Sequence, residues 1–430
     1  MKKASWIPIF FFLLPLTLLG LIGLLDTDQT VSATENRRLT PMPSFSLSAL
    51  MDGSWAAGFS SYYADAFPLR ERLLAANTGL NAFYAFSPFP ADSGEATLAV
   101  PFGGDQVAHA DPAPTEASPQ PDEAFTAGDV LLVGDRAMYT GWLNEKIIAR
   151  YGDAVTALAS ALEDLPVTSM LIPNSGAFYA PEKWRTGQRN QADIIAAAYA
   201  ALPERVRTAD AYGALAPHTE EYIYFRSDHH WTQRGAYYGY TALCAALGLT
   251  PRPLADSISG VLPGDFLGSF YTLLSAYPQA AALAGAPDKV EYWRGGSLDA
   301  CVCTAYETAD MAAGSPCAVL DLQYAGTNLY EAFFGGDKPL LKLETGADTG
   351  RTALVVKDSQ ANALLPFLLE DYDCLYIVDP RYFNLSEKPV FDLPAFAAAN
   401  GVDEVLLING EGILNNETYQ RYLAALVPAE

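Results

Sequence analysis

The sequence predicts a three-layer α/β domain built on a parallel sheet, preceded by a transmembrane helix. Two features indicate this: an alternation of short apolar runs with helical patterns, and a long apolar run near the N-terminus. Short apolar runs alternate with helical patterns beyond residue 129, which is typical of parallel strands covered on both faces. The alternation is interrupted between about residues 250 and 344, where Gly, Tyr and Pro are frequent. An uncharged apolar run over residues 4–25 is long enough to cross a bilayer.

The N-terminal run follows two lysines and precedes Asp26 and Asp28. By the positive-inside rule this places the N-terminus in the cytoplasm. A cleaved signal peptide is the alternative, with Val-Ser-Ala at residues 31–33 as a cleavage site. The run is longer than the usual apolar part of a signal peptide, which favours an uncleaved single-pass anchor over residues 1–28. Both alternatives place the rest of the chain outside the cytoplasm.

Composition limits the classes of partner. Half of the 430 residues are hydrophobic and 12% are aromatic, which is ample material for a core. The net charge of −24 argues against binding to nucleic acid, whose phosphates require a basic surface. It suits a strongly solvated extracytoplasmic domain.

Changes of composition divide the chain into segments. Residues 29–86 form a membrane-proximal helical region, and residues 87–128 form an insertion rich in Pro, Ala and Asp that is too polar to bury much surface. Residues 129–430 form the α/β domain, with an irregular insertion over about 250–344.

Within the α/β domain, strands and helices follow from the apolar patterns. The expected strands are residues 130–133, 167–172, 222–225, 353–356, 374–378 and 405–408. The expected helices are residues 142–164, 192–202 and 361–369, and one that is capped by Thr232 and ends at Gly248.

A Ser-Asp-His-His-Trp-Thr motif at residues 227–232 is the first candidate for chemistry. It lies in the loop that enters the last of these helices, a common position for functional groups. On extended backbone, Asp228 and His230 point to the same side and His229 points away. A carboxylate beside one imidazole nitrogen fixes the tautomer and leaves the other nitrogen as a base. The alternative is a capping aspartate beside histidines packed in the core.

Ser359 is the candidate nucleophile. It follows the apolar strand 353–356 and precedes a helical pattern, a position that can present a hydroxyl at the carboxyl edge of a sheet. The N–H groups that follow it could stabilise an oxyanion. The alternative is that Ser359 only caps that helix.

The five cysteines, at positions 244, 301, 303, 317 and 374, are too few and too irregular for a disulfide framework. A Cys303–Cys317 bridge and a set of unpaired thiols are both compatible with the sequence. A metal site formed by Asp228 and the two histidines is conceivable, but no second Cys/His cluster completes it. We therefore expect neither a metal nor a cofactor.

The order of these motifs resembles the bacterial DHHW-motif proteins, which look related to the alginate O-acetylation proteins and to the SGNH hydrolases. The matching segments, in chain order, are residues 35–39, 63–70, 171–174, 227–232, 333–336, 357–359 and 379–382. The resemblance implies an SGNH-like fold with Asp228 as orienting acid, His230 as base and Ser359 as nucleophile. Lys357 departs from the pattern, because a Gly-Asp-Ser sequence would have Gly there.

Four further residues are weaker candidates for binding substrate or an oxyanion. Asn174 follows a strand end and either donates from its side chain or only shapes a turn. Trp231 is either a sugar platform or a packing anchor. Arg381 and Tyr382 either line the site or belong to a salt-bridged turn.

The resemblance implies an extracytoplasmic O-acyltransferase or esterase that acts on polysaccharide hydroxyls, with an acyl exporter of the MBOAT type as a membrane partner. The alternative is a catalytically silent member of the family that binds glycan or scaffolds a modification complex. The lysine at position 357 favours that alternative.

Overall fold

The computed structural model describes residues 124–163, 165–385 and 388–427, together with residues 31, 32, 37, 38, 42, 55 and 62. The chain divides into two compact units, Met1–His109 with Ser275–Pro278, and Ala110–Leu274 with Gln279–Glu430. In the first unit, strand β1 (Val31–Ser32) pairs antiparallel with β2 (Arg37–Arg38). The expected anchor over residues 1–28 lies outside the described residues, as do nearly all of the segment 29–86 and residues 87–123. No helix in the described part combines the length and the apolar character that crossing a membrane requires.

An eight-stranded sheet forms the centre of the second unit, in the order β11-β10-β12-β14-β13-β15-β6-β7. Its strands are β6 (Val167–Ile172), β7 (Val206–Ala209), β10 (Val302–Tyr306), β11 (Gly314–Cys317), β12 (Leu340–Glu344), β13 (Thr352–Lys357), β14 (Cys374–Val378) and β15 (Glu404–Gly410). The five strands from β14 to β7 are parallel, whereas β12, β10 and β11 are added antiparallel at one edge. The expected parallel sheet is therefore confirmed for these five strands only, and the fold is α/β with a mixed sheet.

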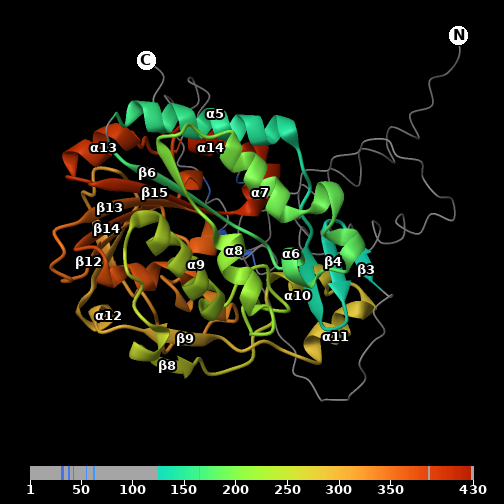
Figure 1. Ribbon diagram of the computed structural model, residues 1–430. Coiled ribbons are helices and arrows are strands. Elements are labelled where there is room, and N and C mark those ends of the chain that lie inside the picture. Colours follow the sequence, from blue (N-terminus) through green and yellow to red (C-terminus); the bar gives the residue numbers. More distant parts are fainter. Residues whose placement is uncertain are drawn as a thin grey trace, which may run out of the picture. The chain divides into compact units, whose positions relative to one another are not determined.

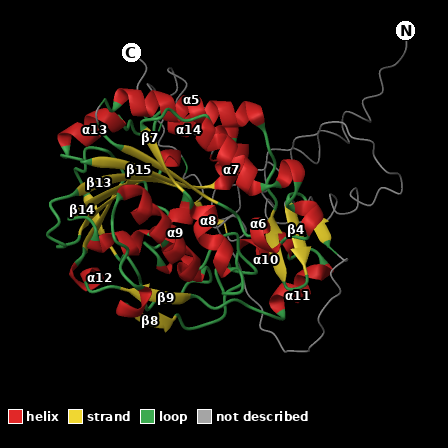
Figure 2. Cartoon of the chain, in the orientation of Figure 1, coloured by secondary structure: helices red, strands yellow, loops and turns green. Residues whose placement is uncertain are grey.

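Helices cover both faces of this sheet (Figures 1 and 2). The helices α5 (Glu145–Ala161), α7 (Gln191–Ala200), α13 (Leu393–Ala399) and α14 (Glu417–Ala424) cover one face, and α8 (Ala211–Leu215) and α9 (Gln233–Leu247) cover the other. Side chains alternate along the strands, so that Leu354 joins the core under α5 while Val355 joins the core under α9. Two cores on opposite faces give the expected three layers.

The remaining elements are short. A separate antiparallel sheet contains β3 (Phe125–Ala127), β4 (Val130–Val133) and β5 (Arg136–Tyr139), and β8 (Ile258–Val261) pairs with β9 (Glu291–Arg294). The short helices are α6 (Gly176–Tyr179), α10 (Ser269–Leu274), α11 (Ala281–Ala284) and α12 (Ser297–Ala300). Three 3-10 helices matter for the site: η6 (Leu329–Ala332), η7 (Ser359–Ala363) and η10 (Glu411–Asn415).

Three expected elements differ from the structure. The run 130–133 is a strand, but it belongs to the separate three-stranded sheet. Residues 222–225 form no strand of the main sheet, and only Tyr224 makes an isolated bridge, to Trp231. The helix expected over 361–369 is instead two 3-10 helices, η7 and η8 (Leu365–Glu370), with Pro366 at the start of the second.

A disulfide joins Cys303 to Cys317, which are directly paired across β10 and β11. Of the two alternatives that the sequence left open, the structure contains the bridge. Cys244, Cys301 and Cys374 are free thiols.

Candidate active site

The 227–232 motif occupies a tight loop that leads into α9. The loop closes through hydrogen bonds from the Phe225 N–H to the His230 carbonyl (3.3 Å) and from the Thr232 N–H to the Ile223 carbonyl (3.0 Å). Thr232 caps α9 as expected, because its hydroxyl oxygen accepts from the Gly235 N–H. Gly248 ends the helix in the left-handed conformation. The acid and the histidines therefore lie at the tip of a loop and not at the end of a sheet strand.

A buried aspartate, Asp288, holds this loop in place. Its carboxylate accepts from the Ser227 N–H (2.8 Å), the Ser227 hydroxyl (2.5 Å) and the Arg226 N–H (3.0 Å). Asp288 is 0% exposed, so these bonds satisfy a charge that would otherwise be costly to bury. The loop conformation thus depends on a residue far along the chain, in the irregular region.

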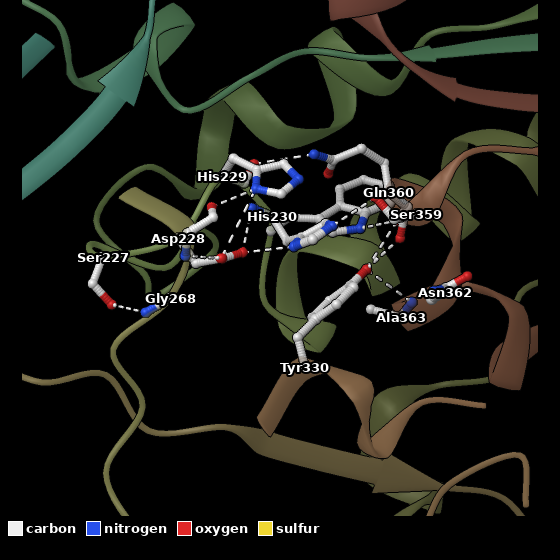
Figure 3. Close-up of polar contacts among 12 residues, drawn as sticks. Ser227, Asp228, His229, His230, Gly268, Tyr330, Ser359, Gln360, Asn362 and Ala363 are labelled. Atoms are coloured by element: carbon white, nitrogen blue, oxygen red, sulfur yellow. Dashed lines mark hydrogen bonds and ion pairs between the residues drawn. The ribbon is translucent and has the colours of Figure 1, made fainter. Parts of the chain in front are cut away.

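Asp228, His230 and Ser359 form a continuous chain of hydrogen bonds (Figure 3). The Asp228 carboxylate lies 2.6 Å from His230 Nδ1, and His230 Nε2 lies 2.9 Å from Ser359 Oγ. Asp228 and His230 are 3% and 1% exposed, whereas Ser359 is half-buried. The three residues that the sequence singled out therefore meet in the order that a nucleophile, a base and an orienting acid require.

Ser359 stands at the carboxyl end of β13, as expected, at the start of η7. The cap of that helix is Asp358, whose side chain accepts from the Gln360 N–H (3.0 Å) and from the Gly410 N–H at the end of β15 (2.9 Å). The alternative in which Ser359 is only a helix cap is therefore wrong, and its hydroxyl is available to His230. The Gln360 N–H, however, is taken up by the cap and is not free to bind an oxyanion.

Tyr330, from η6, joins the two halves of the site. Its ring stacks on the His230 ring with centroids 3.8 Å apart and planes 10° apart. Its hydroxyl donates to the Ser359 carbonyl (2.8 Å) and accepts from the Ala363 N–H (3.3 Å). Figure 3 shows this ring lying between the histidine and the η7 backbone. Tyr330 thus fixes the plane of the imidazole relative to the serine turn.

Electrostatics keep Asp228 ionised. Burial alone would raise the pKa of Asp228, but the charges of His230 and His229 and hydrogen bonds from His230 and the Ser269 N–H lower it well below its usual range. A carboxylate that stays charged holds the proton of His230 on Nδ1 and leaves Nε2 as the acceptor that faces Ser359.

His229 lies closer to the site than extended backbone would place it. Its ring centroid is 3.8 Å from that of His230, and its Nδ1 is 2.6 Å from the Ser269 hydroxyl. Burial and the neighbouring charge of His230 lower the pKa of His229 to about 3, so the ring is neutral at ordinary pH. The expectation that it points away from Asp228 and His230 is wrong, because the loop is too tightly curved for alternating side chains.

Asp228, His229 and His230 could together hold a metal ion, since each offers a ligand atom and these atoms lie within 4.8 Å of one another. A metal on His230 Nδ1 would displace the hydrogen bond to Asp228, and a metal on Nε2 would displace the one to Ser359. The two uses therefore exclude each other.

The weaker candidates fall into two groups. Trp231 is fully buried and donates from Nε1 to the Gln360 carbonyl (2.7 Å), so of its two considered roles only packing fits. The Asn174 amide bonds to the Gly176 N–H, Gln191 and Glu411, which makes it a turn residue. Neither side chain is directed to a substrate.

Arg381 and Lys357 belong to one buried cluster of charges. The Arg381 guanidinium bonds to Asp379 and Asp337, and Lys357 Nζ lies 2.5 Å from Asp337. Lys357 is 1% exposed, so the lysine in place of glycine forms an internal ion pair below the serine turn. Tyr382 is 38% exposed beside this cluster. The cluster matches the salt-bridged turn that was one of the two alternatives for Arg381.

Residues that sequence reasoning missed come from the irregular region. Gly268 and Ser269 support Asp228, Asp288 locks the loop, Tyr330 stacks on the base, and Asp337 neutralises Lys357. None of them lies in a periodic pattern. The Phe-Phe-Gly-Gly segment at residues 333–336, which directly follows η6, was the only nearby signal.

Fold and site together define an α/β protein that carries an aspartate, a histidine and a serine in hydrogen-bond sequence at the carboxyl edge of a central parallel strand. Its sequence matches the model of the DHHW protein family over residues 100–378. The chain belongs to the DHHW family, as the order of its motifs predicted.

Several solved structures are similar to this chain. A DHHW family protein from Eubacterium siraeum is 26% identical, with a TM-score of 0.61, and the match covers 71% of this chain and 99% of that one. Bacillus cereus PatB1 with a sulfonyl adduct is 18% identical, with a TM-score of 0.55 over 69% of this chain and 99% of that one. The O-acetyltransferase domain of Pseudomonas putida AlgJ is 14% identical, with a TM-score of 0.39 over 69% of this chain and 98% of that one. Among curated proteins, none matches the sequence.

Proposed function

We propose that this protein is an SGNH-like O-acyltransferase or esterase that acts on polysaccharide hydroxyls, with Ser359 as nucleophile, His230 as general base and Asp228 as orienting acid. The observation that carries the proposal is the unbroken chain of hydrogen bonds from Asp228 through His230 to a half-buried Ser359. In addition, the sequence resembles the alginate O-acetylation proteins, which supports acetyl as the group transferred.

The geometry suits acyl transfer in two steps. Ser359 Oγ attacks the carbonyl carbon of the acyl donor while His230 Nε2 accepts the hydroxyl proton. The bond between the acyl carbon and the donor oxygen then breaks, and His230 returns the proton to that leaving oxygen. In the second step, an acceptor hydroxyl or water loses its proton to His230 and attacks the acyl carbon. The bond between that carbon and Ser359 Oγ breaks, and His230 returns the proton to Oγ.

Each supporting residue has a definite part in these steps. Asp228 stabilises the imidazolium that forms twice per cycle, because its lowered pKa keeps it negatively charged. Tyr330 keeps the imidazole from rotating out of line with Ser359. Small departures from such alignment are costly, since misplacement by about 1 Å lowers a rate by about a hundredfold.

The setting is part of the same proposal. We propose that the apolar run at residues 4–25 anchors the protein in the cell membrane with its α/β domain outside the cytoplasm. An MBOAT-type exporter would then supply the acyl group on the outer side. A reporter enzyme that is active only outside the cytoplasm tests this. Fused to the C-terminus of the protein, it should be active.

The direct test is hydrolysis of 4-nitrophenyl acetate by the full chain. Ser359→Ala and His230→Ala should each abolish acetate release, and both should keep the wild-type far-UV circular dichroism spectrum. Arg207→Gln, at an exposed position on β7, serves as the control and should keep activity within about threefold. Activity that survives both alanine substitutions would remove the triad.

Two other outcomes identify the alternatives. A folded wild-type protein that releases no acetate and leaves its serines unmodified by a fluorophosphonate probe would be a catalytically silent family member that binds or scaffolds. Activity that is lost with a chelator and restored by Zn²⁺ would instead point to the Asp228–His229–His230 metal site.

A further inference from the structure

An arginine held between two tryptophans lies on the surface near the candidate active site. The Arg189 guanidinium carbon is 4.9 Å from the Trp142 ring centroid and 4.8 Å from the Trp184 ring centroid. Trp142 is 46% exposed, and Trp184 packs partly against the small sheet that contains β4. We call Trp142, Trp184 and Arg189 the Trp–Arg platform. A stacked, planar guanidinium loses little freedom on binding, because the indole rings already hold it.

The platform stands at the edge of the site. Trp142 follows three residues after Tyr139, so their Cα atoms lie at most about 11 Å apart. The Tyr139 ring is 6.4 Å from the His229 ring. Burial raises the pKa of Tyr139, and the nearby negative charge of Asp228 raises it further. A chain of sugar units that crosses the platform is therefore within reach of Ser359.

Two segments build the platform and are tied to each other. In the chain, Trp142 lies between β5 and α5, whereas Trp184 and Arg189 lie between α6 and α7. The Leu143 N–H donates to the Gln188 carbonyl (2.7 Å), and Arg189 donates to the Thr140 hydroxyl (2.7 Å). Hydrogen bonds thus preorganise the platform.

The platform is also linked to the serine turn. Gln191, two residues after Arg189, bonds to Asn174, and Asn174 donates to Glu411 (3.1 Å). The residue before Glu411, Gly410, donates its N–H to Asp358, which precedes Ser359. The second platform segment is therefore anchored to the same edge of the sheet as the nucleophile.

Positively charged side chains gather in the segment that carries Arg189. The chain has 26 Lys and Arg against 50 Asp and Glu, and arginines elsewhere, such as Arg234 and Arg351, pair with carboxylates. Among the described residues no carboxylate forms an ion pair with Arg189. Lys183 and Arg185 are exposed in the same segment, so residues 182–190 carry three positive charges against one negative charge, that of Glu182. In a chain of net charge −24, this is a local site for an anion.

We propose that the Trp–Arg platform binds an acidic polysaccharide, with a sugar ring against the exposed Trp142 indole and a carboxylate or phosphate group on the Arg189 guanidinium. Guanidinium matches both anions through paired hydrogen bonds. Indole offers a broad apolar face to the C–H side of a sugar. The inference deepens the proposed function, since it names the class of acceptor that would be delivered to Ser359.

Affinity gel electrophoresis of the full chain tests the platform. The gels contain polygalacturonate as the carboxylate probe, phosphomannan as the phosphate probe, or dextran as the neutral control. The wild-type protein should be retarded by at least one acidic polymer and not by dextran, and the two acidic gels show which anion is preferred. Arg189→Gln and Trp142→Ala should each weaken the apparent affinity about tenfold.

Arg207→Gln is the matched control, because Arg207 is an exposed arginine on β7. It should bind like the wild-type protein. Arg189→Gln and Trp142→Ala should keep kcat/KM for 4-nitrophenyl acetate within about twofold, which confirms that they fold and that the triad is intact. Unchanged affinity in both variants, equal retardation by dextran, or no retardation by either acidic polymer would overturn the platform. Binding that depends on Arg189 in a protein without esterase activity would instead overturn the proposed function alone.

Discussion

Asp228 and His230 are almost completely buried, whereas the hydroxyl that they would activate belongs to a half-buried residue at the edge of the sheet. Burial strengthens the hydrogen bond between acid and base, because the local dielectric constant is low. Partial exposure of Ser359 leaves room for an acyl donor. The residue-scale arrangement therefore combines a rigid acid–base pair with an accessible nucleophile.

His229 should make stability depend on pH. Burial lowers the pKa of His229 to about 3, whereas an unfolded histidine titrates near 6.5. Between these values the unfolded chain binds a proton that the folded chain does not, so the free energy of unfolding falls as the pH falls from about 6.5 towards 3. Lowering the pH from 7 to 5 should therefore lower the free energy of unfolding of the wild-type protein by about 2 kcal/mol more than that of the His229→Asn variant.

Urea unfolding at the two pH values measures this difference. Carboxylates away from His229 titrate alike in both proteins, and Asp228 stays charged between pH 5 and 7 because its pKa is well below its usual range, so their contribution cancels in the comparison. An equal loss of stability in wild type and variant would show that His229 is protonated in the folded state.

Residues that carry chemistry could be found from the sequence because each belongs to a local pattern. Asp228 and His230 stand together before a well-capped helix, and Ser359 follows an apolar strand. Their partners could not be found in this way. Tyr330, Asp288 and Ser269 reach the site through contacts between distant segments, which no local pattern encodes.

At the scale of elements, the site depends on close contact between two loops. A side chain at Gly268 would collide with the Asp228 carboxylate, because an added Cβ would overlap its Cβ and Oδ2 atoms. Only glycine allows the Ser269 N–H to reach Asp228, at 2.8 Å.

Gly268→Ala should consequently displace Asp228 and lower kcat for 4-nitrophenyl acetate by about a hundredfold. Gly296→Ala is the control, because a Cβ at Gly296 meets open space, and it should keep activity within about twofold. Thermal unfolding of both variants separates loss of alignment from loss of fold. A Gly268→Ala variant with wild-type kcat would show that the two loops can separate without effect on the site.

The buried cluster around Lys357 should contribute to stability. Removal of Lys357 leaves Asp337 and Asp379 with one cation, Arg381, in a nearly solvent-free position. Breaking a buried ion pair costs about 3–5 kcal/mol, whereas an exposed pair contributes at most about 1 kcal/mol. Lys357→Met should therefore destabilise the protein by about 3 kcal/mol or more.

Lys342→Met provides the matched control, because Lys342 pairs with Glu344 on the surface. This substitution should lower the free energy of unfolding by less than about 1 kcal/mol. Urea denaturation of the two variants gives the comparison. Similar losses of stability in both variants would mean that Lys357 and its carboxylate partners are solvated.

The apolar patterns predicted the parallel strands of the main sheet, but not the antiparallel strands beside them. Runs such as 405–408 are buried on both faces and correspond to β15. The two outermost strands on the antiparallel side, β10 and β11, expose many side chains and contain polar residues, so they carry no such signal. The direction of pairing is also not encoded in an apolar run, which is why β12 was not expected as an antiparallel neighbour of β14.

At the scale of the whole molecule, the irregular region over about 250–344 is part of the domain and not an appendage. It extends the sheet through β10, β11 and β12, and it supplies the supports of the Asp228 loop and the ring that stacks on His230. Fold and site are therefore completed by the segment in which the sequence offered the fewest patterns.

The disulfide state is testable on the intact chain. Thiol alkylation in denaturant, followed by mass spectrometry, should label three cysteines, Cys244, Cys301 and Cys374, and should label all five after reduction. A bridge between Cys303 and Cys317 suits a domain outside the reducing cytoplasm. Five labelled cysteines without reduction would contradict the bridge.

The central claim is that Asp228 and His230 activate Ser359, and covalent labelling of the full chain tests it most directly. The protein is treated with a fluorophosphonate and its peptides are mapped by mass spectrometry. We predict a single modification, on Ser359, with labelling at least a hundredfold slower in His230→Ala. Modification at another serine, or equally fast labelling of Ser359 without His230, would contradict the claim.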